Sequence, residues 1–289
     1  MTDVVYVTHE IDPSVHGSHV DTDLELVVSE FDRVGLDWAV AAWDDHGFDW
    51  SDARLVLVRS PWDYVLRRRE FLEWARDVET LAVVANPAAV LEQNTDKVYL
   101  RTLASHGVRT VATGWIHDAD DAGRVIARMR QDHGARVVVK PTVSSAARGT
   151  ILTSDPLEAE AHARLVLAQG FGVMVQPYLE AVEAEGEISV VVIDGRPSHA
   201  VRRAPALSDS PDAAFGELVE LTDELHHASC AVLHAAEAED LVYARVDLVR
   251  EADGALALME LELTEPSLFL TLHEPAAQAL AAAVASRLS

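Results

Sequence analysis

The segment VDLVREADGALALMELEL, residues 246–263, constrains the fold of this chain more than any other stretch. Its Asp253-Gly254 pair lies between two apolar runs, and Asp-Gly in that setting is the strongest short-range sign of a β-hairpin. A second such pair, Asp194-Gly195, lies within ISVVVIDGRPSHAV at 188–201. We therefore predict that the C-terminal third of the chain is mainly antiparallel sheet.

The first of these hairpins places charged residues opposite one another. With a two-residue Asp-Gly loop, opposed residues have numbers that sum to 507, so Asp247 faces Glu260. By the same count Arg245 faces Glu262, and all four side chains project from one face. Opposed like charges are destabilising unless they are neutralised, and carboxylate oxygens suit Mg²⁺. The pattern predicts a magnesium site; the alternative is a half-exposed face with a surface ion pair to Arg245.

The hairpin at 188–201 gives a sum of 389 by the same count, which places Glu187 opposite Arg202. Two interpretations stay open. The pair is a cross-strand salt bridge, or the carboxylate and the guanidinium line the same cleft. Both can hold together.

Composition argues against several classes of protein. The formal net charge is −25, from 23 basic and 48 acidic residues, which fits neither a general nucleic-acid-binding surface nor an anionic-membrane surface. The single cysteine, Cys230, excludes a disulfide framework within one chain. No charged segment followed by an apolar run opens the chain, and no stretch of about 18 apolar residues occurs. We expect a soluble cytoplasmic protein without nucleic-acid or membrane partners.

The first ninety residues alternate between two patterns. Runs rich in Val and Leu predict strands, and helical patterns lie between them, which is typical of a small parallel α/β sheet. Neither a dinucleotide-binding nor a Walker-type glycine motif is present. The predicted strands are 3–8, 36–43, 54–59, 81–86, 110–116, 135–141 and 172–180. The predicted helices are 21–34, 67–79, 95–105, 119–131, 155–168, 214–237 and 274–287.

Six motifs follow one another along the chain: NTDK, VVVKPT, VQPYL, EGEIS, ARVD and ELELTEPS. Their order and spacing resemble the ATP-grasp superfamily, which includes D-alanine–D-alanine ligases and glutathione synthetases. The resemblance covers the whole chain. It implies an α/β fold, α+β in the C-terminal half, in which a small parallel sheet precedes two α+β units that clasp ATP. The implied domains are 1–90 on the substrate side, 91–175 as the lid, and 176–289 with the antiparallel sheet and metal site.

The only two lysines of the chain match the family's phosphate-binding lysines. Lys97 follows NTD and Lys140 closes an apolar run, whereas the other 21 of the 23 basic residues are arginine. A compact ammonium makes a point-charge contact to phosphate that the broader guanidinium cannot copy in a tight site. Surface solubility is the alternative role for two scattered lysines.

Other ATP contacts follow from the same resemblance. The loop SSAARG at 144–149 matches the flexible loop that closes over the phosphates, although it has one glycine where relatives often have several. QPYL at 176–179 matches the hinge whose backbone contacts the adenine edge. Either Glu183 or Glu187 is placed for the ribose hydroxyls or the substrate. The implied ATP-contacting residues are Lys97, Lys140, Ser144, Ser145, Arg148, Gly149, Gln176, Pro177, Tyr178, Leu179, Glu183 and Glu187.

The resemblance also implies roles near the metal. The implied magnesium ligands are Asp247, Glu260 and Glu262. Many relatives have Asn at the position of Glu262. Arg245 matches an arginine that stabilises the charged intermediate, and Arg202 or Arg203 reaches the phosphates. The implied catalytic residues are Arg245, Lys140 and Arg202.

The segment VRSPWDY at 58–64 follows an apolar run, and ligands of open α/β sheets bind beyond the carboxyl ends of the strands. Arg59 can hold a substrate carboxylate bidentately, and Asp63 an amino group. The alternative is a structural turn with Trp62 packed in an interdomain core. HEIDPS at 9–14 is a weaker candidate for the same cleft. The expected substrate-binding residues are Arg59, Ser60, Trp62, Asp63, Tyr64 and Ser267.

Within the superfamily, RSPWDY, SHAVRR and ELELTEPSLF most resemble the branch that contains the O-ureidoserine cyclo-ligase of cycloserine biosynthesis. That resemblance implies an enzyme with ATP and Mg²⁺ as cofactors. It phosphorylates a small amino-acid-like carboxylate, and the substrate's own nitrogen then closes a ring, converting O-ureido-D-serine to D-cycloserine. The alternatives are an intermolecular amino-acid ligase and a non-catalytic nucleotide-binding module. Relatives are often dimers, so a homodimer is expected by analogy.

Overall fold

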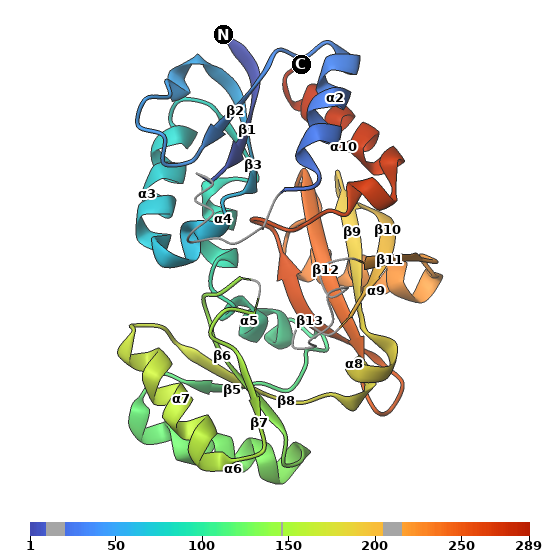
Figure 1. Ribbon diagram of the computed structural model, residues 1–289. Helices are drawn as coiled ribbons and strands as arrows, with labels where there is room; N and C mark the ends of the chain where they lie inside the picture. Colours follow the sequence, from blue (N-terminus) through green and yellow to red (C-terminus); the bar gives the residue numbers. More distant parts are fainter. Residues whose placement is uncertain (10–20, 146, 205–215) are drawn as a thin grey trace.

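The computed structural model describes residues 1–9, 21–145, 147–204 and 216–289, in which three β-sheets are arranged around the centre of the molecule (Figure 1). The strands are β1 Thr2–Thr8, β2 Trp38–Ala42, β3 Ala53–Ser60, β4 Val83–Ala85, β5 Gly114–Ile116, β6 Val137–Pro141, β7 Ile151–Thr153, β8 Val173–Pro177, β9 Glu187–Ile193, β10 Arg196–Arg203, β11 Gly216–Val219, β12 Tyr243–Arg250 and β13 Leu256–Glu262. The α-helices are α2 Leu24–Val34, α3 Arg68–Glu79, α4 Ala88–Asn94, α5 Tyr99–Ser105, α6 Ala122–His133, α7 Pro156–Ala168, α8 Glu180–Glu185, α9 Asp223–Ala235 and α10 Glu274–Arg287.

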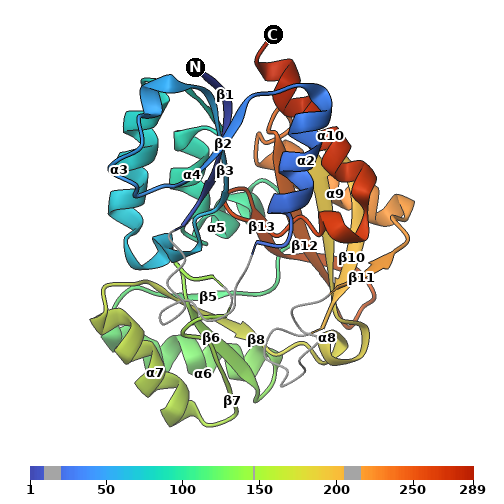
Figure 2. The same cartoon turned by 45° about the horizontal axis from the view of Figure 1, so that its top comes forward.

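The N-terminal sheet has the strand order β2-β1-β3-β4 with every pairing parallel, which confirms the predicted α/β fold of this part. Its central strands are buried on both faces, and such strands read as continuous apolar runs. One face packs against α3 and α4. The other packs against α2, in a core that also contains α10, β9 and β12 (Figure 2). The N-terminal and C-terminal parts of the chain therefore share a core.

The middle sheet, β5-β8-β6-β7, is antiparallel and carries α6 and α7 around a core of its own. The single helix predicted for 95–105 is wrong at its start. α4 ends at Asn94 and α5 begins at Tyr99, and Lys97 lies in the turn between them. The Lys97 N–H donates to the Thr142 carbonyl (2.9 Å), which ties this turn to the end of β6.

The C-terminal sheet has the order β11-β10-β9-β12-β13 and is antiparallel throughout, as predicted. The helix predicted for 214–237 is wrong at its start, because β11 occupies 216–219 and α9 begins only after Thr222. The Thr222 hydroxyl accepts the N–H of Leu225 (3.3 Å) and so caps α9. The helix predicted for 274–287 is confirmed as α10.

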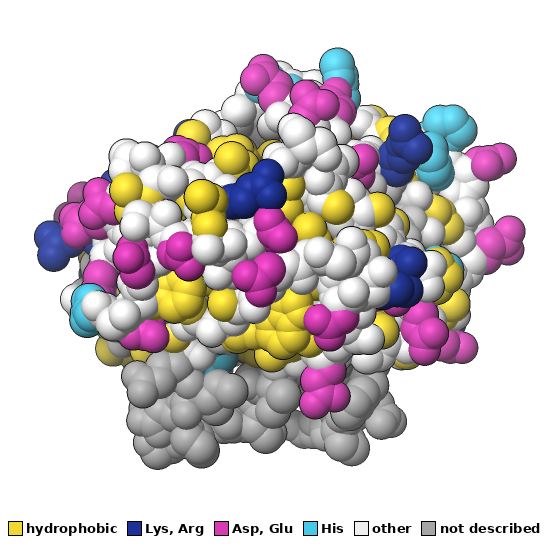
Figure 3. Space-filling view, turned by 90° about the horizontal axis from the view of Figure 1, so that it is seen from above, with side chains coloured by type: hydrophobic (Ala, Val, Ile, Leu, Met, Phe, Trp, Pro, Cys, Tyr) yellow, Lys and Arg dark blue, Asp and Glu magenta, His cyan; other side chains and the backbone are white. Residues whose placement is uncertain are grey.

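The surface agrees with the composition. The face in Figure 3 has many acidic and few basic side chains, as expected for a net charge of −25. Within the described part of the chain, none of the helices has the length and apolar character needed to cross a bilayer.

Candidate active site

Strands β12 and β13 bring the predicted carboxylates together. Asp247 lies opposite Glu260, and Arg245 lies opposite Glu262, as the count from the turn predicts. One oxygen of each carboxylate lies within 4.8 Å of the others. Three oxygen ligands grouped in this way fit a hard divalent cation.

The turn of this hairpin is longer than the predicted two-residue loop. The Glu251 N–H donates to the Ala255 carbonyl (2.9 Å), which leaves three loop residues, and Gly254 takes the left-handed conformation (φ 83°) that such loops favour. A bulge at Met259 then adds one residue to β13, so the predicted pairing of Asp247 returns. The extra loop residue and the bulge shift the register in opposite directions, so the pairs Asp247–Glu260 and Arg245–Glu262 are those that the count predicts.

Cations from two elements neutralise this group. The Arg245 guanidinium donates from Nε and Nη2 to Asp247 (2.9 Å each) and from Nη2 to Glu262 (2.5 Å). The Lys97 ammonium lies 3.1 Å from a Glu260 oxygen. Each of the three carboxylates thus has a positively charged partner.

The pairing of β9 with β10 differs from the prediction at its charged residues. The Asp194-Gly195 turn has the expected two residues, but a bulge at Ser198 shifts the register, so Glu187 faces Arg203 and the predicted opposition to Arg202 is wrong. Arg202 projects from the opposite face, half-exposed, 3.8 Å from Glu217.

Arg203 joins β9, β10 and β12 around the carboxylates. Its Nη2 donates to Glu187 (2.9 Å) and to Asp247 (2.7 Å), and its Nε donates to the Ser189 hydroxyl (2.7 Å). Ser189 in turn donates to Asp247 (2.7 Å). Gly186 makes this approach possible, because a Cβ there would lie 2.4 Å from the Arg203 carbonyl oxygen. Arg203 therefore stands where the sequence count placed Arg202.

The carboxyls of this group differ in their affinity for protons. Burial opposes ionisation of Asp247, but Arg203 and Arg245 outweigh it and lower the pKa to about 2. Burial of Glu262, reinforced by the charges of Glu260 and Asp247, outweighs Arg245 and raises the pKa to about 8. One carboxylate is thus firmly ionised, while another takes up a proton near neutral pH unless a further cation arrives.

The two lysines are in different electrostatic states. The Lys97 Nζ donates to the Ser144 carbonyl (2.6 Å), and although burial would lower its pKa, Glu260 raises it. Lys140 projects from β6 and makes no hydrogen bond or ion pair with the described residues. Burial, helped by Lys97, lowers the pKa of Lys140 despite the charge of Glu260. The charge of Lys140 is therefore available for an anion.

The NTDKVYL motif holds strand β13 as well as supplying a lysine. The Asn94 side chain donates to the Leu261 carbonyl (2.7 Å) and accepts the N–H of Leu263 (2.7 Å). The Tyr99 hydroxyl accepts the N–H of Leu261 (3.0 Å). These contacts fix the backbone on either side of Glu262.

The loop 144–149 lies between β6 and β7. Ser144 is buried, and its carbonyl accepts a hydrogen bond from Lys97 Nζ. Ser145 is half-buried and Arg148 is exposed. Gly149 has a φ of 69°, and a Cβ there would lie 3.0 Å from Pro141 Cγ. The one glycine of the loop is therefore placed where a larger residue would be strained.

The hinge residues 176–179 run from β8 into α8. The Gln176 amide donates to the Thr113 hydroxyl (3.0 Å), and Pro177 closes the strand beside Val137. The Tyr178 N–H donates to the Arg136 carbonyl (3.0 Å), and its hydroxyl donates to Glu183 (2.6 Å). Leu179 precedes α8. Glu183 thus lies beside the hinge, and Glu187 lies among the carboxylates.

The segment 58–64 contacts the chain that leaves β13. Arg59 is buried and its Nη2 donates to the Pro266 carbonyl (2.7 Å). The Trp62 Nε1 donates to the Glu265 carbonyl (3.1 Å), and the Tyr64 hydroxyl donates to a Glu265 carboxylate oxygen (2.7 Å). These are the interdomain contacts of the alternative interpretation.

Asp63 is engaged by neighbouring side chains. Its carboxylate is buried, accepts the indole N–H of Trp43 (2.8 Å) and pairs with Arg67, and its role in holding an amino group stays a prediction. Ser60 is also buried and donates to the Thr8 hydroxyl (3.1 Å). The Ser267 carbonyl accepts from Arg245 (3.3 Å). Residues 10–14 of HEIDPS lie outside the described residues.

Sequence reasoning missed several residues of this site. Ser189 was not foreseen, and the bulge at Ser198, which no pattern announced, concealed that Arg203 and not Arg202 faces Glu187. Glu265 does have a signal in the sequence: it is a carboxylate directly before Pro266, in the segment that follows β13. No sequence pattern indicates a role for Asp23. Its carboxylate nevertheless accepts the N–H groups of Leu268 and Leu270 (2.9 Å each), which lie near the other end of the chain.

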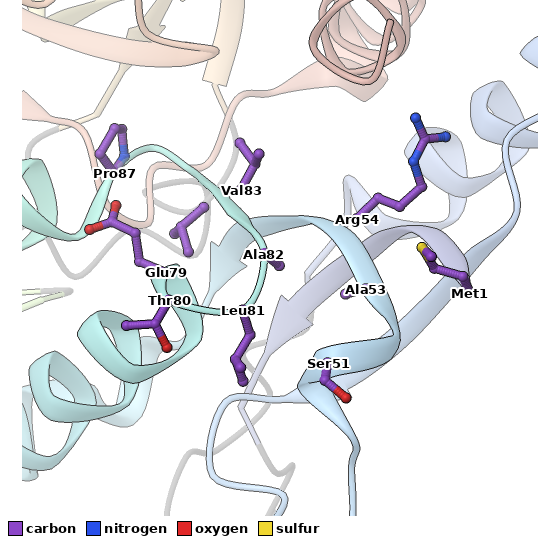
Figure 4. A pocket seen from close by; sticks show the side chains of 11 residues that line it. Met1, Ser51, Ala53, Arg54, Glu79, Thr80, Leu81, Ala82, Val83 and Pro87 are labelled. Carbon is purple, nitrogen blue, oxygen red and sulfur yellow. The ribbon is translucent and has the colours of Figure 1, made fainter.

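Two cavities lie away from these residues. One, of about 730 Å³, opens at the outer edge of the N-terminal sheet, where Leu81, Val83 and Arg54 line it (Figure 4). The other, of about 550 Å³, lies between α9 and the chain after α5. Neither contains a residue of the predicted site.

Comparison with known proteins gives two family matches in succession. Residues 4–86 match the N-terminal domain of D-cycloserine synthetase DcsG, and residues 94–268 match the RimK-like ATP-grasp domain. The cycloserine biosynthesis protein DcsG of Streptomyces lavendulae is 33% identical over 286 residues, which cover 93% of this chain and 95% of that protein.

Solved structures agree. A crystal structure of D-cycloserine synthetase DcsG superposes with a TM-score of 0.89 at 31% identity and covers 99% of both chains. A RimK domain ATP-grasp protein from Sphaerobacter thermophilus has a TM-score of 0.70 at 16% identity over 99% of this chain and 98% of its own, which shows a common fold. The chain therefore belongs to the ATP-grasp ligases, which use ATP to form carbon–nitrogen bonds, and its RimK-like ATP-grasp domain follows an N-terminal domain of the DcsG type.

Proposed function

We propose that this protein is a Mg²⁺-dependent cyclo-ligase that converts O-ureido-D-serine to D-cycloserine, with release of ADP, phosphate and the carbamoyl group, which leaves as carbon dioxide and ammonia. The observation that carries the proposal is the similarity to DcsG over nearly the whole chain. The carboxylate group of β12 and β13, with its lysines and arginines, supports it. A small amino-acid-like carboxylate is the substrate, and a second copy of the chain is the expected partner.

ATP lies, in this proposal, between the units 91–175 and 176–289, with 1–90 on the substrate side. Lys140 binds phosphate oxygens, because its ammonium forms no hydrogen bond or ion pair with the described residues. The loop 144–149 covers the phosphates. The hinge contacts adenine through backbone groups other than the Tyr178 N–H, which the Arg136 carbonyl already takes.

Asp247, Glu260 and Glu262 would hold Mg²⁺, which supplies positive charge against the triphosphate when bound. The three carboxylate oxygens lie close together, and the pKa of Glu262 is raised to about 8. Both observations indicate that the negative charge of this group exceeds the positive charge around it, which a bound cation would balance. With a cation held there, Lys97 would be released from Glu260 and its ammonium would be available to the phosphates.

The chain's own residues then act by positioning and charge. The substrate carboxylate attacks the γ-phosphorus and ADP leaves, giving an acylphosphate; the substrate nitrogen attacks its acyl carbon and phosphate leaves. Water then cleaves the carbamoyl group from the ring nitrogen, and it leaves as carbamic acid, which breaks down to carbon dioxide and ammonia. Arg245 and Arg203 hold Asp247 rigidly and place positive charge beside the reacting groups. No protein nucleophile is needed, because alignment and charge neutralisation supply most of the catalysis in phosphoryl transfer.

The test is ADP release by the purified protein with O-ureido-D-serine, ATP and Mg²⁺, with the product identified by mass. Ring closure needs no second substrate, so addition of other amino acids should not change the product. A product whose mass is the sum of two amino acids less water would instead identify an intermolecular ligase.

A further inference from the structure

Glu265 differs from every other carboxylate around the site. It lies three residues after Glu262, half-buried, and the described residues give it no cationic partner. One oxygen accepts the Tyr64 hydroxyl (2.7 Å), and the described residues donate nothing to the other. Its backbone carbonyl accepts the Trp62 indole N–H (3.1 Å). The side chain is thus held in place with one oxygen open.

The neighbouring carboxylates are already engaged by cations. Asp247 binds Arg203 and Arg245, Glu262 binds Arg245, and Glu187 binds Arg203. Glu260 pairs with Lys97. A proton acceptor for the second half of the proposed reaction must therefore come from outside this paired set, on the side where the substrate domain meets β13.

We propose that Glu265 is a catalytic base that accepts the proton of the substrate nitrogen during ring closure. The step rests on the proposed function. The nitrogen attacks the acyl carbon and forms the C–N bond, the bond from that carbon to the phosphate oxygen breaks, and phosphate leaves with its electron pair. The N–H proton passes to the open oxygen of Glu265. A ureido nitrogen is a weak nucleophile, so removal of its proton as the bond forms contributes to the rate.

The surroundings of Glu265 suit this role. Burial and the charge of Glu260 raise the pKa of Glu265 to about 7, against the Tyr64 hydroxyl, Lys97 and Arg245. A base with a pKa near the working pH combines an adequate ionised fraction with a sufficient affinity for the proton. Burial and the charge of Glu265 raise the pKa of Tyr64, so this hydroxyl stays protonated and orients the base as a donor.

Hydroxylamine separates the two halves of the reaction. It is a strong external nucleophile that converts an acylphosphate to a hydroxamate without a protein base. We expect Glu265→Gln to lose about 100-fold or more in cyclised product while hydroxamate formation stays within threefold of wild type. Tyr64→Phe, which keeps the carboxylate and removes its orienting hydroxyl, should lose about tenfold in ring closure alone. Glu25→Gln, exposed on α2, is the matched control and should change neither.

Two results would overturn the role of Glu265. Ring closure within threefold of wild type in Glu265→Gln excludes a base there. An equal loss of hydroxamate and ring in both Glu265→Gln and Tyr64→Phe assigns the pair to binding or to phosphoryl transfer instead. If wild type itself forms ADP but neither hydroxamate nor ring from O-ureido-D-serine, the proposed function fails, and the assignment of Glu265 fails with it.

Discussion

Lys97 and Lys140 differ in their ion pairing: Lys97 pairs with Glu260, whereas Lys140 pairs with none of the described residues. The Lys97 ammonium fits between the Ser144 carbonyl and Glu260, a space that a planar guanidinium does not match. Lys140 is close enough to Lys97 to have its pKa lowered by it, so a bulkier cation there would meet both burial and repulsion.

We expect Lys97→Arg and Lys140→Arg each to reduce ATP-dependent ADP release by about 30-fold or more, although both keep the charge. Arg69→Lys is the control for the chemical change, since this side chain is 92% exposed on α3. Normal turnover in both lysine variants would mean that the two lysines have no role at the phosphates.

Asp247 has two roles that one substitution tests: it pairs with Arg203 and Arg245, and it is a proposed magnesium ligand. Asn keeps its shape and some of its hydrogen bonds, but it removes the charge that Arg203 and Arg245 share. We expect Asp247→Asn to lower the free energy of unfolding by about 3 kcal/mol, because breaking a buried pair leaves uncompensated charge.

The same variant should need at least about tenfold more Mg²⁺ for half-maximal ADP release, since one oxygen ligand loses its charge. Urea unfolding and a Mg²⁺ titration measure the two effects. Asp253→Asn, on the exposed turn of the same hairpin, is the control. An unchanged Mg²⁺ requirement would exclude Asp247 as a ligand.

At the level of elements, the two hairpins explain why sequence reasoning succeeded at one strand pair and failed at the other. Around Asp253-Gly254 the predicted loop was too short by one residue, and the bulge at Met259 compensated. Around Asp194-Gly195 the loop was right, and the bulge at Ser198 moved the partner of Glu187 from Arg202 to Arg203. Loop chemistry is local and readable, whereas bulges depend on the twist and packing of the whole sheet.

Strand β13 depends on the turn between α4 and α5 for its position. Asn94→Ala removes the hydrogen bonds to Leu261 and Leu263, and we expect a loss of about 1–3 kcal/mol in unfolding free energy. Because these bonds flank Glu262, affinity for Mg²⁺ should fall as well. Tyr99→Phe, which removes only the acceptor for the Leu261 N–H, should have a smaller effect on both. Denaturation and Mg²⁺ titration of the two variants test this, and a stable Asn94→Ala protein with unchanged Mg²⁺ binding would contradict it.

The whole molecule is assembled more tightly than the motif order suggested. The sequence indicates three successive units, and their sheets are present, but α2 packs with α10, β9 and β12 in one core. Asp23 likewise anchors Leu268 and Leu270. Such contacts join residues more than one hundred and fifty positions apart, and a single sequence gives no pattern for them. For this reason the sequence alone does not predict that side chains of the segment 58–64 contact the chain after β13; their role in binding substrate stays a prediction.

Protons on the site's carboxyls link the stability of the molecule to pH. The pKa of Glu262 is raised to about 8 and that of Glu265 to about 7, from an ordinary value of 4.5. Between pH 4.5 and about 8 the folded protein therefore binds more protons than the unfolded chain. The stability that these carboxyls contribute is fully present below pH 4.5 and is lost as the pH rises towards 8. Asp247, with its pKa lowered to about 2 from 3.8, has the opposite effect, but only at more acidic pH.

We expect the protein without Mg²⁺ to melt at a lower temperature at about pH 8 than at about pH 5.5, and Mg²⁺ with ADP to stabilise it more at the higher pH. The cation binds ionised carboxylates, so binding near pH 7 should release about one proton. Thermal melts measure the first effect, and calorimetry in buffers of different ionisation enthalpy measures the second. Glu262→Gln, a neutral isostere, should reduce the pH slope to the part that Glu265 contributes and should abolish the proton release. A melting temperature that rises from pH 5.5 to 8 would mean that these carboxyls titrate as exposed ones do, and that the site does not depend on a cation for its charge balance.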